Sequence, residues 1–113
     1  MTVYQAYMEA LKLLGYTHED GSITVDGTLL KILTFANAIM VEIKGEEFEP
    51  FTKISDVIPL SKRQIYDLFI YGLCMWIASD LADGDKQQIF ASLYEQKKHL
   101  LTKRYEIEDT FLR

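Results

Sequence analysis

The chain has 113 residues, of which 49% are hydrophobic and 26% charged, so its size and composition fit one globular domain and argue against a disordered chain. Seventeen acidic and twelve basic residues give a formal net charge of -5, the opposite sign from that expected of a protein that coats duplex DNA. The lone cysteine, Cys74, excludes an intramolecular disulfide and predicts a buried thiol in a reducing compartment. No signal peptide is visible, and the longest apolar run is much shorter than the about 20 residues of a membrane span. We therefore expect a soluble, cytoplasmically made protein.

The first predicted helix covers residues 2–14. Thr2 and Gln5 have the spacing of a capping box, and Gly15 can take the left-handed conformation that ends a helix. The apolar residues recur at helical spacing on one stripe: Val3, Tyr7, Ala10, Leu11 and Leu14. Residues 16–27 then read as a connector with two Asp-Gly turns and a short extended stretch at 22–25.

The second predicted helix begins near residues 26–28 and ends before Gly45. Its core stripe is formed by Leu29, Ile32, Leu33, Ala36, Ile39, Met40 and Ile43. Leu30, Phe35 and Val41 lie off that stripe, so this helix carries apolar residues on more than one side.

Residues 44–60 form the longest irregular stretch. Pro50 and Pro59 exclude a continuous helix, and the segment also carries three closely spaced glutamates. Its apolar anchors are Phe48, Phe51, Ile54, Val57 and Ile58. A loop of this length in a small domain often contacts a partner.

The third predicted helix has the clearest start, a capping box formed by Ser61 and Gln64, and runs to about residue 82. Residues 68–78 within it are apolar all the way round. Such a helix is buried either in the centre of a bundle or against another subunit. Gly72 is unfavourable in a helix interior and therefore indicates close approach of a neighbouring backbone.

The fourth predicted helix follows Gly84, which ends the third, and Asp85 with Gln88 caps its start. Its stripe comprises Ile89, Phe90, Leu93, Tyr94, Leu100, Leu101 and Tyr105. Lys97 interrupts the stripe and is expected to lay its aliphatic stem over apolar surface. We divide the chain into a helical domain, residues 1–105, and a C-terminal tail, residues 106–113. The predicted fold is all-α: a small bundle of about four helices, with a long irregular or short extended connector between the second and third.

No catalytic or metal site is visible. His18 and His99 are isolated, and one cysteine with two scattered histidines lacks the ligand spacing of a zinc site. Asp80, Asp83 and Asp85 fail the ligand pattern of a calcium loop. Phosphate-binding loops and nucleophile elbows are also lacking. We expect no enzymatic activity, no metal and no cofactor.

Two surface features indicate interaction. Lys97, Lys98, Lys103 and Arg104 form a basic cluster, which is either a solvated face near a helix C-terminus or a patch that pairs with an acidic protein surface, nucleic acid being a weaker possibility. The all-round apolar third helix and the 12% aromatic content exceed what a small bundle must bury alone. This surplus predicts self-association.

Part of the sequence, residues 55–102, resembles the head–tail connector (adaptor) proteins of tailed double-stranded DNA phages and prophages. The resemblance lies in an ordered set of segments: DVIPL at 56–60, LFIYGLCMWIA at 68–78, GD at 84–85, QQIF at 87–90 and YEQKK at 94–98. Many members of that family have an extended D-x-[IL]-P segment, a YG-[LV]-x-x-x-[IL]-A helix, a GD turn and an F-x-x-x-Y helix.

The resemblance implies a virion structural protein, made in the bacterial cytoplasm, that assembles at the head–tail junction. Its subunits would form a ring, commonly of twelve copies, that docks beneath the portal protein and extends the DNA channel towards tail or stopper proteins. The channel wall would be acidic, and we expect neither sequence-specific nucleic-acid binding nor membrane binding. The alternative is a cytoplasmic helical protein-binding module, such as a tail-assembly chaperone or regulatory adaptor, with an exposed apolar groove and no ring.

Candidate residues follow from these interpretations. Those expected in the core or between subunits are Phe35, Phe69, Gly72 and Trp76. Those expected to dock partners are Phe48, Phe51, Ile107, Phe111 and Leu112.

Overall fold

A computed structural model describes residues 1–24 and 27–112, and within that range it describes side chains as far as residue 100. Its elements are α1 (Val3–Leu14), the 3-10 turn η1 (Thr28–Lys31), α2 (Ile32–Lys44), α3 (Lys62–Gln64), the π-helical turn η2 (Ile65–Phe69), α4 (Ile70–Asp80) and α5 (Gly84–Leu112). Because α3, η2 and α4 follow one another without a break, the described chain forms four helices. It contains no strand, only isolated bridges between Thr2 and Val57 and between Thr17 and Ile23. The predicted all-α bundle is confirmed.

Local capping explains where two of the helices start. The Thr2 hydroxyl accepts the Gln5 N–H at 3.2 Å, while the Gln5 side chain accepts the Thr2 N–H at 2.9 Å. Ser61 and Gln64 form the same reciprocal pair at 3.1 and 3.0 Å. Both predicted capping boxes are confirmed.

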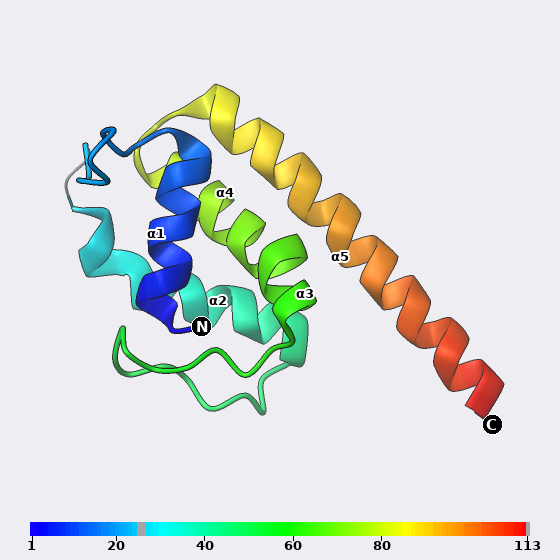
Figure 1. Ribbon diagram of the computed structural model, residues 1–113. Coiled ribbons are helices and arrows are strands. Elements are labelled where there is room, and N and C mark those ends of the chain that lie inside the picture. The colour runs from blue at the N-terminus through cyan, green and yellow to red at the C-terminus, as the bar shows by residue number, and fades with distance from the viewer. Residues whose placement is uncertain (25–26, 113) are drawn as a thin grey trace.

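The helix α4 runs through the middle of the bundle, between α1 and α5, with α2 packed across it (Figure 1). Phe69, Ile70, Leu73, Cys74 and Ile77 expose 1% or less of their surface. Burial raises the pKa of the Cys74 thiol to about 12. Of the two environments expected for this apolar helix, the structure therefore has the centre of the bundle.

The burial begins in the π-helical turn η2. Ile65, Leu68 and Phe69 are buried within it, and the burial continues into α4 with Ile70.

Gly72 is a contact point between three helices. A Cβ at this position would lie 3.0 Å from Ile39 Cδ1 of α2 and 3.1 Å from Tyr94 Cε2 of α5. The expected approach of a neighbouring backbone is therefore wrong, because the space is filled by two side chains.

On α2, the structure alters two expectations about the apolar stripe. Phe35, placed off the stripe, is 7% exposed and stacks on Trp76 with ring centroids 5.6 Å apart. Leu29, placed on the stripe, is 38% exposed because it lies in η1, before the α-helical register begins. Ile32, Ala36, Ile39 and Met40 are buried as expected.

The turn between α4 and α5 differs from the prediction. Ala82, with φ of 57°, takes the left-handed position expected of Gly84, and the N–H groups of Ala82 and Asp83 bond back to carbonyls of the last turn of α4. Gly84 is instead the first residue of α5. The Asp83 carboxylate accepts the Lys86 N–H at 3.4 Å, so Asp83 and not Asp85 caps this helix.

The helix α5 is longer than expected. Residues 106–112, predicted as a separate tail, continue α5 to Leu112. Its first half packs against the other helices. Its second half, residues 99–112, projects beyond them, and we call it the arm (Figure 1). The last described contacts to the body are made by the Tyr94 hydroxyl, which donates to Glu42 at 2.7 Å, and by Lys98, which donates to the same carboxylate at 3.2 Å.

Candidate partner-docking surface

The segment 44–60 is irregular, as predicted, and is fastened to the start of α1. The Val3 N–H donates to the Asp56 carbonyl at 3.0 Å, and the Tyr4 N–H donates to the Ile54 carbonyl at 2.9 Å. The first N–H groups of a helix have no partner within the helix itself. The loop supplies these partners and thereby becomes part of the fold.

Asn37 on α2 holds the middle of the same loop. Its side-chain oxygen accepts the Phe51 N–H at 2.7 Å, and its amide nitrogen donates to the Phe51 carbonyl at 3.2 Å. One side chain therefore pairs both backbone groups of a residue whose ring is buried.

Asp56 closes the turn formed by residues 52–56, directly after Phe51. Its carboxylate accepts the N–H groups of Thr52 and Lys53 at 2.9 and 3.1 Å. These two hydrogen bonds hold the pKa of Asp56 below its ordinary value, because they favour the charged form.

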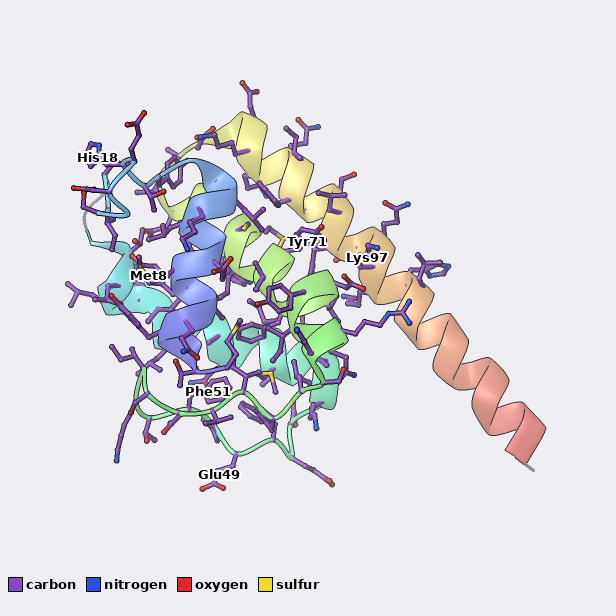
Figure 2. The ribbon with its side chains drawn as sticks, viewed as in Figure 1. Met8, His18, Glu49, Phe51, Tyr71 and Lys97 are labelled. Atoms are coloured by element: carbon purple, nitrogen blue, oxygen red, sulfur yellow. The ribbon has the colours of Figure 1, made fainter. Side chains whose placement is uncertain are left out.

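A groove of about 540 Å³ lies along this loop, and we call it the loop groove. It is lined by Lys44, Phe48, Glu49, Pro50, Phe51, Thr52, Asp56, Val57 and Pro59. Phe51 is buried and meets the half-buried Phe48 edge-on, with centroids 5.2 Å apart. Figure 2 shows Phe51 on the inner side of the loop and Glu49 pointing out into solvent. Of the two loop phenylalanines expected to dock partners, Phe51 is mainly an anchor, and Phe48 is the more accessible.

The other predicted contact residues divide between the core and the arm. Phe69 and Gly72 are fully buried and Phe35 nearly so, whereas Trp76 is half-buried with an indole N–H that is buried without a hydrogen-bond partner. Phe35, Phe69 and Gly72 therefore lie in the core of one chain, and Trp76 packs against that core. Ile107, Phe111 and Leu112 fall on the arm, and their side chains lie outside the described residues.

The basic cluster is only partly available. Lys98 pairs with Glu42 at 3.2 Å and with Glu95 at 3.5 Å. Lys97 is half-buried on α5, consistent with a stem lying on apolar surface. The side chains of Lys103 and Arg104 lie outside the described residues, although their positions are on the arm.

A second polar cluster was not predicted from the sequence. The Tyr16 hydroxyl donates to Asp83 at 2.5 Å, and Lys86 donates to the Leu14 carbonyl at 2.6 Å while lying 4.3 Å from the centre of the Tyr16 ring. Burial and then the neighbouring Asp83 raise the pKa of Tyr16 to about 12. The cluster joins the end of α1 to the start of α5, across too much sequence for any local motif to indicate it.

Candidate ligands for a metal ion are scattered. Across the part of the chain that the structure describes, no three His, Cys, Asp or Glu side chains gather into a possible metal site. His18 and His99 are exposed, and Asp80 pairs with Lys31 at 2.7 Å. Among the described residues, no helix has the length and apolarity needed to cross a membrane.

A scan of protein-family models and searches of curated proteins and of solved structures found no match to this chain. The surfaces that stand out are the loop groove and the arm of α5.

Proposed function

We propose that this protein is a structural subunit of the head–tail connector of a tailed double-stranded DNA phage or prophage. Several copies, commonly twelve, would form a ring between the portal protein and the tail or stopper proteins and would extend the DNA channel. The protein would act by assembly at the head–tail junction of the virion, after synthesis in the bacterial cytoplasm, and not by catalysis.

The observation that carries this proposal is that the resembling segments pack against one another. The Tyr71 and Phe90 rings, from the YG and F-x-x-x-Y segments, have centroids 6.1 Å apart. Gly72 of the first segment makes the space that Tyr94 of the second occupies. An ordered set of motifs whose members touch in space is better support for relatedness than the same motifs scattered over a surface.

The D-x-[IL]-P segment belongs to the same framework. Asp56 accepts the Val3 N–H through its carbonyl and closes the preceding turn through its carboxylate, so it positions the loop against α1. The segments that resemble the connector family therefore determine how the loop, α4 and α5 are arranged.

The surfaces of the chain also suit an assembly role. A compact helical body carries one groove beside an acidic loop and one projecting helix, and the net charge of -5 is compatible with a channel wall that does not retain DNA.

The proposal is tested by measuring the mass of the purified protein by light scattering and native mass spectrometry over a wide concentration range. We expect a closed oligomer of about a dozen chains that grows at the expense of the monomer. A strict monomer at all concentrations, or a dimer that never grows, contradicts the proposal.

One observation favours a second candidate, a helical protein-binding module such as a tail-assembly chaperone or regulatory adaptor. The apolar helix α4 is buried within one chain, so the fold needs no second subunit to cover it. This candidate predicts a monomer or dimer whose loop groove binds a segment of another protein, and the same mass measurement separates it from the connector.

A further inference from the structure

As far as its side chains are described, the arm of α5 makes no hydrogen bond or ion pair with the body of the chain. The last described contacts to the body come from Tyr94 and Lys98, and directly after them His99 is exposed and Leu100 is 55% exposed. From there the backbone continues as a helix to Leu112, away from the other helices (Figure 1).

A bare helix with the composition of the arm is poorly stable in water. Isolated helices shorter than about 12–15 residues are marginal even with favourable sequences, and most helical stability in proteins comes from packing an apolar face. The apolar residues in this part of the sequence are Leu100, Leu101, Tyr105, Ile107, Phe111 and Leu112. So large an apolar share indicates that another surface covers the arm.

The loop groove offers a surface of matching character. Phe48, Pro50, Val57 and Pro59 give it apolar walls. Beside it, Glu46, Glu47 and Glu49 are exposed, and no ion pair among the described residues neutralises them. The start of the arm carries Lys103 and Arg104, close in sequence to Lys97 and Lys98, whereas the acidic residues Glu106, Glu108 and Asp109 follow further along it. The basic start of the arm and the acidic edge of the groove therefore carry opposite charges.

We propose that the arm of one copy of this chain packs into the loop groove of a second copy. The occupant is a second copy because the second half of α5 projects away from its own body (Figure 1), while the groove lies along the loop 44–60 on the body itself. The contact joins two different surfaces and is therefore head-to-tail, which gives a ring if the rotation between copies closes and an open chain if it does not. The contact itself does not depend on the proposed function. Only the expectation that the copies close into a ring rests on it.

Charge reversal on each side tests the contact. The groove variant carries Glu46→Lys and Glu47→Lys, and the arm variant carries Lys103→Glu and Arg104→Glu. Each variant alone should lose assembly and have the mass of one chain. Mixed together, they should regain assembly with the two variants alternating, because the intact arm meets the intact groove and the reversed arm and reversed groove again carry opposite charges. The control, Glu19→Lys with Asp85→Lys, makes the same charge change as the groove variant at exposed positions elsewhere and should assemble like the wild type.

The outcomes separate this contact from the proposed function. Rings that persist in both variants overturn the contact and leave the connector proposal standing. Open chains or dimers that disappear in both variants support the contact and count against a ring. A monomeric wild type, or a mixture of variants that fails to regain assembly while each is folded by circular dichroism, overturns the contact.

Discussion

Gly72 illustrates how a single residue decides the packing of three helices. It lies in the first turn of α4, where an added methyl group would press on Ile39 of α2 and on Tyr94 of α5. The Tyr94 hydroxyl is in turn held by Glu42, so the ring has little freedom to retreat.

Replacing Gly72 with alanine should therefore destabilise the fold. Overpacking costs about 1–3 kcal/mol, against at most about 1 kcal/mol gained from the better helix propensity of alanine. We expect a net loss of about 1–2 kcal/mol in the free energy of unfolding, measured by urea denaturation. Gly84→Ala is the matched control, because no atom lies within 4 Å of its Cβ position, and it should change stability by less than about 0.5 kcal/mol. Equal effects of the two substitutions would contradict the packing described for Gly72.

Asn37 has a comparable role for the loop 44–60. The substitution Asn37→Ala leaves the Phe51 N–H and carbonyl without their partner, and an unpaired buried polar group costs about 1–3 kcal/mol. We expect faster amide hydrogen exchange at Phe51 and a lower unfolding free energy. Thr34→Ala, at an exposed position of α2, should leave the exchange of Phe51 unchanged. Unaltered exchange in the Asn37 variant would show that the loop is held by other contacts.

Asp56 makes the stability of the same loop depend on pH. Its pKa is lowered by the N–H groups of Thr52 and Lys53, so its contribution is fully present above the unfolded-state value of about 3.8 and is lost as the pH falls through the lower folded-state value. The melting temperature of the wild type should exceed that of Asp56→Asn at pH 5, and the difference should shrink towards pH 2. A difference that does not depend on pH would contradict the role of the charge.

Among the elements, short sequence motifs correctly predicted those features that depend on contacts between residues a few positions apart. Both capping boxes, the stripe of α1 and the irregular loop were predictable because each depends on residues a few positions apart. The α4–α5 turn was not, because Ala82 adopts a conformation that favours glycine and leaves Gly84 free to begin α5. The groove residues Phe48 and Phe51 were predicted, but the attachment of Phe51 to Asn37 was not, since nothing in either local sequence indicates that pairing.

The arm is the element whose extent differs most from the prediction. Residues 106–113 alternate polar residues with Ile107, Phe111 and Leu112 and are too few to fold alone, which favoured a separate tail, yet the backbone remains helical to Leu112. Among the side chains that the structure describes, the last hydrogen bond from α5 to the body is made by Lys98.

Deleting residues 109–113 should consequently impair docking to a partner and leave the fold intact. We expect an unchanged melting temperature and near-ultraviolet circular dichroism spectrum, together with a loss of assembly or of partner binding. An unfolded truncated protein would show that the end of the arm belongs to the core, and normal assembly would show that it makes no contact.

For the whole molecule, the structure changes which residues are expected to mediate self-association. The apolar surplus that predicted it is largely absorbed within one chain, because α4 is covered by α1, α2 and α5. Among the described residues, the apolar side chains that remain exposed include Leu30, Val57 and Leu100, and the last two belong to the loop groove and the arm. The proposed self-association therefore rests on these two surfaces and not on the central helix.

The central claim, that this small helical subunit is built to form a connector ring, is tested most directly by electron microscopy of the purified protein at high concentration. The account predicts closed rings of about a dozen copies around an open channel. Particles the size of a single chain at every concentration, or compact dimers without a channel, would contradict it.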